Sequence, residues 1–318
     1  MTALLSPSPT ITHTPQKKQM TIGIAIFTHE SVHHLPFCLP PLLNSPIKPR
    51  VLVVNTSSND GTLQLARDLG AETLVIPRSD FNHGSTRERA RRHLGTDIVV
   101  MMTHDAYAAD PDMIEKLIKP IIEGKAAIAY ARQVPRNDAD FFESFPRKYN
   151  YPPKSQLRSL ADTKTFGVYT FFCSDSCAAY LNGALDSVGG FPAVLVGEDT
   201  VVTAKLLRKG HRIAYVAEAI VIHSHHYTLA QEFQRAFDTG LARRSYHALL
   251  QCESSDMKRG ISYVGAMLLE LARSQPQSIP YALLHTAVRF TAYQLGRLSL
   301  NAPLWFKRRC SGQQYYWK

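Results

Sequence analysis

The stretch TIGIAIF at residues 21–27 is short and almost wholly apolar, and the polar run THES at 28–31 follows it directly. The arrangement recurs at 51–61, where the apolar run VLVV precedes the polar run NTSSNDG. A continuous apolar run of this length is typical of a strand that is buried on both faces, as in a parallel sheet. We therefore expect two buried strands here, each followed by a polar loop.

Strand and helix patterns continue to alternate as far as residue 130. Helices are expected at 62–69 and 85–94 and from Pro111 to about 122, and strands at 73–76, 98–102 and 126–130. This alternation predicts an α/β fold, a Rossmann-like and mostly parallel sheet with helices on both faces. In such sheets ligands bind beyond the carboxyl ends of the strands, where the polar clusters after the first, second and fourth strands lie.

The remaining sequence predicts a long insertion and a helical end. Residues 132–160 are charged and aromatic and contain prolines, which favours an insertion beside the site. Beyond it, the patterns predict a strand at 168–172, a helix from about 175, a helix at 200–209, short strands at 212–216 and 219–222, and helices at 229–250, 257–274 and 279–299. We divide the chain into a disordered leader at 1–19, a catalytic domain at 20–230 and a C-terminal helical, basic region at 231–318.

Composition and charge narrow the class of protein. Of the 318 residues 45% are hydrophobic and 19% are charged, which indicates a globular chain. The five cysteines are scattered, which favours a reducing cytoplasm and buried thiols over a disulfide frame or a zinc site. No apolar stretch is long enough to suggest a spanning helix. The net charge is +10, and residues 257–318 carry nine Lys or Arg against one acid. This excess of positive charge leaves three interpretations open: the region binds nucleic acid, it binds an anionic membrane surface, or it is a solvated face.

The C-terminal region has a pattern that favours a membrane surface. One helical face of 281–299 is expected to carry Tyr281, Leu284, Val288, Ala292, Leu295 and Leu298, with His285 and Arg289 toward the other face. The run LWFKRR at 304–309 places aromatic residues before basic ones, an order that suits the interface with anionic lipids. We expect a cytoplasmic protein held peripherally on the inner face of the plasma membrane. The alternative is that the apolar face packs on the catalytic domain or in a homodimer.

Acids and histidines at the predicted strand ends are the candidates for chemistry. Asp105 follows an apolar strand and could bind a divalent metal, although a capping role is its alternative. Glu198 and Asp199 follow a glycine turn and precede a helix, so either is a candidate general base or a cap. His223 and His225 project to one side of a continuing strand, which suits metal ligation as well as a hydrogen-bonded turn.

A basic helix near the same edge is a candidate phosphate site. Arg87 and Arg91 share one helix face, and His83 and Gly84 lie near its start. The helix N-terminus and the arginine forks favour an anion there. The chain has no glycine-rich dinucleotide motif after the first strand, no P-loop and no GxSxG elbow, so dehydrogenases, P-loop kinases and α/β-hydrolases lose their main support.

Taken in order, these segments resemble family-2 glycosyltransferases of the GT-A fold, and the resemblance covers about residues 21–240. The opening motifs are TIGIAIFTHE and VVNTSSNDGT, and the later ones resemble the bacterial rhamnosyltransferase-like branch: DFNHGSTR (80–87), THDA (103–106), FFCSD (171–175), GED (197–199) and HSHHYT (223–228).

The resemblance implies roles for individual residues. Asp199 would be the base that deprotonates the acceptor, with Glu198 as the alternative. Asp105 would be the last acid of the metal-binding DxD element, helped by His223 or His225, with Mg²⁺ or Mn²⁺ as the ion. The donor would be bound by Thr28, Glu30, Asn55, Ser57, Asp60, His83, Gly84, Arg87 and His104.

Two positions depart from the family pattern. Asn55 stands where the family usually has Asp, which leaves an amide in place of a carboxylate for base recognition. Thr103 stands at the first acidic position of the DxD element, so one carboxylate remains at that strand end.

The resulting prediction is an inverting glycosyltransferase of bacterial surface polysaccharide synthesis. It would use a nucleotide-diphosphate sugar, expected to be dTDP-L-rhamnose, and a glycan or lipid-linked acceptor, and would not bind nucleic acid. The alternatives are a nucleotidyltransferase and a non-enzymatic sugar-nucleotide or polyanion binder.

Overall fold

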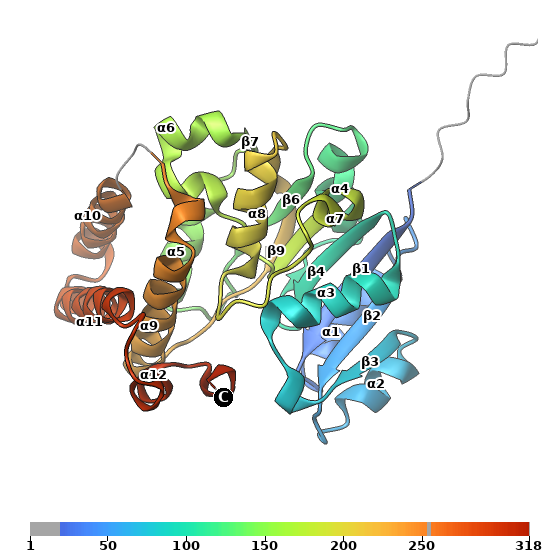
Figure 1. Ribbon diagram of the computed structural model, residues 1–318, viewed down its shortest axis with the longest axis horizontal. Helices are drawn as coiled ribbons and strands as arrows, with labels where there is room; N and C mark the ends of the chain where they lie inside the picture. Colours follow the sequence, from blue (N-terminus) through green and yellow to red (C-terminus); the bar gives the residue numbers. More distant parts are fainter. Residues whose placement is uncertain (1–19, 253–255, 318) are drawn as a thin grey trace, which may run out of the picture.

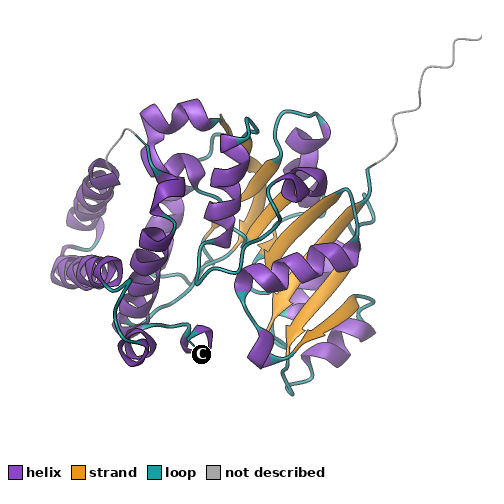
Figure 2. Cartoon of the chain, in the orientation of Figure 1, coloured by secondary structure: helices purple, strands orange, loops and turns teal. Residues whose placement is uncertain are grey.

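The computed structural model describes residues 20–252 and 256–317. The described residues form one nine-stranded mixed sheet with helices packed on both faces (Figure 1; Figure 2). The strands are β1 (Ile22–Thr28), β2 (Arg50–Thr56), β3 (Glu72–Ile76), β4 (Ile98–Thr103), β5 (Tyr107–Ala108), β6 (Ile128–Val134), β7 (Gln156–Arg158), β8 (Cys177–Leu181) and β9 (Ile213–Ile222). The leader predicted at 1–19 lies outside the described residues.

The sheet order is β3-β2-β1-β4-β8-β6-β9-β5, and β7 pairs with β9. The strands β3, β2, β1 and β4 are mutually parallel, as the sequence predicts, and β6 is parallel to β9. Between these two groups β8 runs antiparallel to both β4 and β6. Because β8 is antiparallel, the segment that leads into it lies at the carboxyl edge of β4.

Alternate residues of the central strands point into two separate cores. Ile24 and Ile26 of β1 are fully buried on one face with α1 (Leu35–Leu43) and α4 (Met113–Ile122). Ala25 points to the other face, which is covered by α3 (His83–Leu94) and α8 (Glu198–Arg208). This explains the continuous apolar run of β1, since a strand covered on both faces has no solvated side.

The helices of the first part of the chain agree with the predicted alternation, and the C-terminal helices lie together on one side of the sheet (Figure 1). The remaining helices are α2 (Thr62–Asp68), α5 (Phe141–Asn150), α6 (Thr163–Phe166), α7 (Asn182–Ser187), α9 (Leu229–Ser245), α10 (Asp256–Ser274), α11 (Ile279–Leu298) and α12 (Leu304–Cys310), with short 3₁₀ turns at Arg78–Asp80, Leu160–Asp162, Gly167–Phe171, His247–Leu250, Pro276–Ser278 and Gln314–Tyr316.

Three local expectations are wrong. Residues 168–172 form a 3₁₀ turn at Gly167–Phe171 instead of a strand, and the helix expected from Asp175 is the strand β8. The segments predicted as two short strands join into the single strand β9, whose pairing with β6 shifts register between Ala131 and Arg132. The stretch 132–160, predicted as an insertion, contains α5 and β7. For β7, β8 and β9, pairing with distant strands overrides the local pattern.

The face of α11 that packs on the protein also differs from the predicted one. Ala282, His285, Ala292 and Gly296 are buried, whereas the predicted apolar face leaves Leu298 84% exposed. Gly296 lies so close to α9 that a Cβ there would collide with the carbonyl oxygen of Phe237. The two helices therefore pack through small residues, and part of the apolar surface of α11 faces outward. Across the described ranges, no helix has the length and apolarity needed to span a bilayer.

Candidate active site

Asp105, His223 and His225 meet at the carboxyl edge of the sheet, just beyond β4 and β9. Nε2 of His223 lies 3.6 Å from Oδ1 of Asp105, and Nδ1 of His225 lies 3.3 Å from Oδ2. One ligand atom from each residue falls within 4.8 Å of the others. Two imidazoles and a carboxylate at this spacing form a donor set that suits a divalent cation.

The protonation states of this triad suit metal binding. Burial would raise the pKa of Asp105, but the contact with His223 and the charges of His223 and His225 outweigh it and hold the pKa well below its usual value. Burial lowers the pKa of His225 to about 3, so its ring is neutral at physiological pH. An ionised carboxylate and a neutral imidazole are the forms that ligate a metal.

Gln133 of β6 orients the ring of His223. Its Oε1 lies 3.0 Å from Nδ1 of His223, so Nδ1 carries the proton and donates it to the amide oxygen. The other ring nitrogen, Nε2, is buried, faces Asp105 and has no hydrogen-bond partner among the described residues. A buried nitrogen lone pair beside a carboxylate fits a bound Mg²⁺ or Mn²⁺, with Gln133 fixing the tautomer of the ligand from behind.

The histidine run is joined directly to a helix. His223 continues β9 by donating its backbone N–H to Val134 O at 2.8 Å. Five residues later the side chain of Thr228 accepts from the backbone N–H of Gln231 and begins α9 in a capping box. The neighbouring His226 turns away from the triad toward Asp140 and Glu143 near the start of α5, at 3.6 Å and 3.4 Å. The triad is thus held between a strand end and a capped helix.

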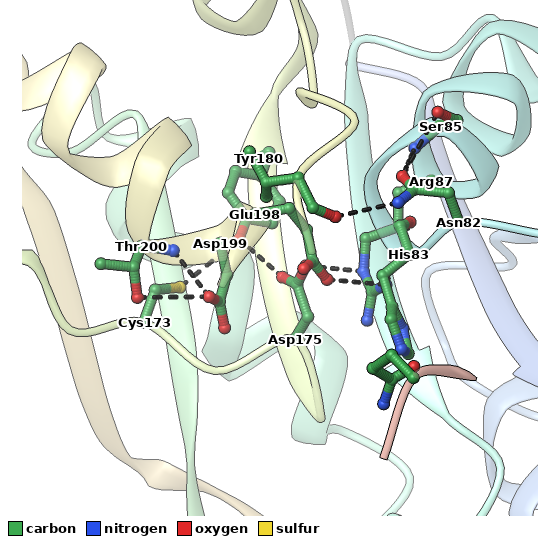
Figure 3. A network of polar contacts seen from close by, with 12 residues as sticks. Asn82, His83, Ser85, Arg87, Cys173, Asp175, Tyr180, Glu198, Asp199 and Thr200 are labelled. Atoms are coloured by element: carbon green, nitrogen blue, oxygen red, sulfur yellow. Dashed lines mark hydrogen bonds and ion pairs between the residues drawn. The ribbon is translucent and has the colours of Figure 1, made fainter. Parts of the chain in front are cut away.

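A second cluster places three carboxyl groups around one buried arginine (Figure 3). Arg87 of α3 forms ion pairs with two carboxylates: its Nε lies 2.7 Å from Oδ2 of Asp175, and its Nη1 lies 2.8 Å from Oε1 of Glu198. Tyr180 of β8 donates its hydroxyl to the other oxygen of Asp175 at 2.6 Å. Asp199 is the third carboxyl group, and among the described residues Arg87 forms ion pairs with Asp175 and Glu198 but not with Asp199. The three acids of the cluster thus share a single guanidinium.

Because the cluster has one positive charge for three carboxyl groups, the pKa values of the three acids differ. The charges of Arg87 and His83 outweigh burial and lower the pKa of Glu198. Burial and the negative charges of Asp175 and Glu198 raise the pKa of Asp199 to about 8. Burial also raises the pKa of Asp175 to about 6. A carboxyl group whose pKa lies in this range can take up and release a proton near physiological pH, which a general base requires.

The first turn of α8 positions Asp199 for this exchange. Gly197 adopts a left-handed conformation with φ of +82°, which turns the chain sharply into the helix. Oδ1 of Asp199 accepts hydrogen bonds from the backbone N–H of Thr200 at 2.6 Å and from its hydroxyl at 3.3 Å. Both bonds use the same oxygen, so Oδ2 remains to receive a proton.

Gln133 also connects the metal-ligand triad with the carboxylate cluster. Its Nε2 donates to Oγ of Ser174 at 2.9 Å, and Ser174 directly precedes Asp175. The path from His223 to Arg87 thus runs through Gln133 and the segment Ser174–Asp175. The two clusters lie at one edge of the sheet and share this polar support.

Comparison with known proteins gives these clusters a family. The model of the family Glycosyl transferase family 2 matches residues 24–189. The chain belongs to glycosyltransferase family 2. It is 35% identical over 306 residues to the O-antigen chain rhamnosyltransferase RfbN of Salmonella typhimurium, covering 94% of this chain and 96% of that protein. It is 34% identical over 274 residues to the O-antigen chain rhamnosyltransferase WbaN of Salmonella anatum, covering 84% and 86%.

Solved structures support the GT-A fold of this glycosyltransferase. The mannosyltransferase PcManGT of Pyrobaculum calidifontis, in complex with GDP-Man and Mn²⁺, matches with a TM-score of 0.61 at 14% identity and covers 91% of each chain. Residues 1–349 of TarS from S. aureus match with a TM-score of 0.51 at 15% identity, covering 93% of this chain and 89% of that fragment. At these identities the likeness establishes the fold alone.

The residues expected around the donor's base and ribose line the loops after β1 and β2. The side-chain amide of Asn55 donates to Oγ1 of Thr28 at 3.2 Å and to Ser58 at 2.9 Å, which joins the two loops. The carboxylate of Asp60 accepts the backbone N–H of Val32 at 3.1 Å. Asn55 thus donates two hydrogen bonds that a carboxylate could not donate, and donor binding by these loops stays a prediction.

Two other residues of that set have unusual backbones. Glu30 and Ser57 both have positive φ values, of 51° and 32°, although neither is glycine. Ser57 donates its hydroxyl to Ile76 O at 3.1 Å, which ties its loop to the end of β3. Strained residues of this kind are frequent in ligand-binding loops.

Of the residues expected to bind the donor phosphates, His104 is half-buried at the sheet edge, whereas Gly84 and Arg87 are buried in the protein. His104 lies beside β1, with Nδ1 3.0 Å from Phe27 O. Gly84 is required for packing, because a Cβ there would collide with the carbonyl oxygen of Pro192. Arg87 is 6% exposed and engaged by two carboxylates, so the structure places it under the candidate base and away from solvent. Its contact with donor phosphate stays a prediction that this pairing disfavours.

His83 begins α3 beside the same cluster. Asn82 precedes it and caps the helix by accepting the N–H of Ser85 at 3.0 Å. Burial lowers the pKa of His83, and the side chain is hydrogen-bonded to Gln313 of the C-terminal segment. The C-terminal segment also brings the ring of Tyr315 to 5.5 Å from that of Phe81. The end of the chain therefore packs against the motif that begins α3.

Several site residues have no sequence signal that separates them from their neighbours. Gln133 lies within a stretch that the sequence predicts as an insertion, and Asp175 lies where it predicts a helix. The FFCSD segment resembles a family motif, which by itself assigns no role to Asp175. An antiparallel strand inserted beside β4 brings Asp175 to the site, and that pairing is a non-local feature.

Proposed function

We propose that this glycosyltransferase moves L-rhamnose from dTDP-L-rhamnose to a hydroxyl group of a glycan or lipid-linked acceptor in bacterial surface polysaccharide synthesis, with inversion at the anomeric carbon. The choice of sugar is supported by the identity with two rhamnosyltransferases over 94% and 84% of the chain. Membership of the family sets aside the nucleotidyltransferase and the non-enzymatic binder considered from the sequence.

The environment of Asp199 is the observation that carries the mechanism. We assign it as the base because its pKa of about 8 lets it accept a proton, whereas the paired Glu198 has a lowered pKa. Oδ2 of Asp199 takes the proton of the acceptor hydroxyl while Thr200 holds Oδ1. The oxygen of the acceptor hydroxyl then attacks the anomeric carbon and displaces the nucleotide diphosphate in a single step, which inverts the configuration at that carbon. Burial and the negative charges of Asp175 and Glu198 raise the pKa of this base, and the charge of Arg87 acts in the opposite direction.

Asp105, His223 and His225 are proposed to hold Mg²⁺ or Mn²⁺, which would neutralise the charge that develops on the leaving diphosphate. The buried, unpaired Nε2 of His223 supports this assignment. Gln133 keeps the proton on Nδ1 of the same ring and so leaves Nε2 free for the ion. The donor's base and ribose are assigned to the loops that carry Thr28, Glu30, Asn55, Ser57 and Asp60, with His83, Gly84 and His104 nearer the phosphates.

We also propose that the C-terminal helices hold the enzyme peripherally on an anionic membrane. Leu298 and Trp305 are 84% and 70% exposed, and Lys307, Arg308 and Arg309 follow directly in α12. Exposed aromatic and aliphatic groups beside basic ones suit a lipid interface. Flotation with anionic and neutral vesicles tests this: the parent should float with anionic vesicles at low salt, and the variant Trp305→Ala with Arg308→Gln and Arg309→Gln should not. Equal flotation of both proteins contradicts the contact, and a homodimer then becomes the use of this surface.

A donor panel tests the proposed reaction. The purified chain is incubated with Mn²⁺ and each of dTDP-L-rhamnose, GDP-mannose and UDP-glucose, and donor hydrolysis and thermal stabilisation are measured. We expect dTDP-L-rhamnose to give the largest response. NMR of the transferred sugar should show the anomeric configuration opposite to that of the donor. Retention of configuration contradicts the single-base mechanism, and a response to a different donor contradicts the assignment of rhamnose alone.

A further inference from the structure

A pocket of about 550 Å³ lies beside the carboxylate cluster, between α5, α9, α10 and α11. Thr200, the neighbour of Asp199 and its hydrogen-bond partner, lies in the pocket wall. The pocket therefore adjoins the proposed base through Thr200. The parallel strands β1 to β4, with the proposed donor loops after β1 and β2, lie on the other side of the molecule (Figure 1).

The wall of the pocket is strongly basic. Arg235, Thr239 and Arg243 follow one another at intervals of four residues and so share one face of α9. Arg259 enters from α10 and Arg289 from α11. A carboxylate in the wall, Glu232, is already engaged by Arg289 at 3.5 Å and by His285 at 3.7 Å. Within the part of the chain that the structure describes, Arg235, Arg243 and Arg259 have no carboxylate partner within ion-pair distance.

Aromatic rings hold two of these arginines in place. The guanidinium of Arg259 lies 3.7 Å from the centroid of the Tyr169 ring, and its Nη2 donates to Asn150 Oδ1 at 2.8 Å. The guanidinium of Arg235 lies 4.3 Å from the centroid of the Tyr227 ring, which lies 5.1 Å from the ring of His225. Cations that are stacked and oriented in this way are prepared for an anion at small cost in side-chain entropy. Arg235 also brings the basic wall next to the metal-ligand triad.

Further rings provide flat apolar faces in the same pocket. They are Tyr149, Phe172, Tyr263, Phe290 and Tyr293. The C–H faces of a pyranose pack against such rings, while its hydroxyl groups and any phosphate require polar partners. A pocket that combines several rings with unpaired arginines matches a sugar joined to an anionic group.

We propose that this pocket binds the acceptor, and that the acceptor is a glycan carrying a phosphate or diphosphate at its reducing end. This rests on the proposed transfer reaction and names the class of its second substrate. Arg235, Arg243 and Arg259 bind the phosphate oxygens in pairs, as guanidinium groups do. The tyrosine rings hold the sugars, and the glycan's reacting hydroxyl extends past Thr200 to Oδ2 of Asp199.

The phosphate could belong to a lipid carrier or to a soluble phosphorylated glycan. Phe290 at the pocket is 61% exposed, and Leu283 and Leu284 are exposed on the same helix. These apolar groups would continue along an alkyl chain that leaves the pocket. Geranyl diphosphate and inorganic diphosphate therefore distinguish the two sources: tighter binding of the alkyl compound identifies a lipid carrier, and equal binding identifies a soluble glycan.

Calorimetry with inorganic diphosphate tests the pocket in the full chain. The titration is made in chelator, so that the triad of Asp105 cannot contribute through a metal. The parent should bind, and Arg243→Gln combined with Arg259→Gln should weaken binding by about tenfold or more. Arg243→Gln alone should show part of this loss, and it removes a side chain without an ion pair in the described structure. The matched controls are Arg273→Gln, an exposed arginine of α10, and Asp105→Asn, and both should bind like the parent.

Kinetics separate this proposal from the proposed function. The double variant should raise the KM for acceptor by about tenfold or more while the donor KM and the hydrolysis of donor by water stay as in the parent. Two results overturn the acceptor pocket. Either the parent does not bind diphosphate in chelator, or the double variant binds it as tightly as the parent. Absence of donor hydrolysis in every protein, with diphosphate binding as expected, overturns the proposed reaction and leaves the anion site standing.

Discussion

Asp105 and Asp199 are the same type of residue at the same edge of one sheet, and their surroundings give them opposite properties. Asp105 is surrounded by histidines and has a pKa well below its usual value. Asp199 is half-buried beside Asp175 and Glu198, and desolvation together with their negative charges raises its pKa to about 8. Carboxyl groups whose neighbours move their pKa values apart take different roles in one reaction.

The difference teaches how a single chain can combine an anion and a base within a small space. A permanently ionised carboxylate is suited to hold a cation against the donor phosphates. A carboxylate that gains a proton near pH 8 is suited to accept the acceptor's proton. Gln133 and the Ser174–Asp175 segment join the two environments, so each can be changed separately and the effect on the other measured.

The largest effect is expected for Asp199→Asn. An amide cannot accept the proton, so turnover should fall by about 10²-fold or more while donor binding is retained. Turnover with saturating donor and acceptor gives the answer, and donor-induced thermal stabilisation is the control. Near-normal turnover in this variant removes Asp199 from the mechanism.

Glu198→Gln is the matched comparison at the neighbouring position. Removing a negative charge beside Asp199 lowers the pKa of the base, so the variant should keep most of its turnover and shift its pH profile to lower pH. If instead Glu198→Gln loses as much turnover as Asp199→Asn, the assignment of the two acids is reversed.

A smaller loss is expected for Asp105→Asn. The metal-ligand triad would lose its carboxylate, so metal-dependent donor binding should weaken by roughly 10- to 100-fold. Calorimetry of donor binding with Mn²⁺ and with chelator measures this. Equal donor affinity with and without metal in the parent, together with full activity in chelator, means that the triad has no metal role.

Gln133→Met tests the support of the triad. The side chain keeps its volume but no longer accepts the proton of Nδ1 of His223, so the metal affinity should fall about tenfold. Activity at saturating Mn²⁺ should recover, because Asp105 and both histidines remain. Activity that stays low at high Mn²⁺ would show instead that Gln133 acts on the carboxylate cluster through Ser174.

The smallest effect is on stability, and its sign follows from the raised pKa of Asp199. Because the folded state holds this carboxyl group neutral and the unfolded state ionises it near pH 4, Asp199 opposes folding increasingly as pH rises from about 4 to about 8. Asp199→Asn should therefore raise the melting temperature by roughly 2 °C or more at pH 8, and by less at pH 5. Thermal melts at both values measure it, and a lower melting temperature at pH 8 contradicts the buried, crowded site.

The sequence was sufficient to predict the parallel half of the sheet and most of the helices, since each depends on a local apolar period. The strand TIGIAIF and the helix 85–94 are examples, and both form as expected. The resemblance to family 2 also implied that Asp105, His223 and His225 share one metal site, and the structure brings the three side chains together. Local patterns could not predict β8, whose small apolar residues become a strand only between β4 and β6.

The roles of Arg87 and Asp175 could not be predicted for the same reason. From the sequence, Arg87 is a cation at a helix start and appears free for phosphate. The inserted strand β8 and the turn before α8 bring Asp175 and Glu198 to its Nε and Nη1, and they engage it inside the protein. Likewise, the buried side of α11 is set by the approach of Gly296 to α9, which the period of its apolar residues does not reveal.

The pH dependence of kcat/KM for transfer tests the central claim most directly, since that claim is that Asp199 is a base with a raised pKa. The account predicts that kcat/KM rises about tenfold per pH unit below about pH 8, levels off above it, and loses this ionisation in Asp199→Asn. A profile that is flat between pH 6 and pH 9, or the same ionisation persisting in Asp199→Asn, would contradict it.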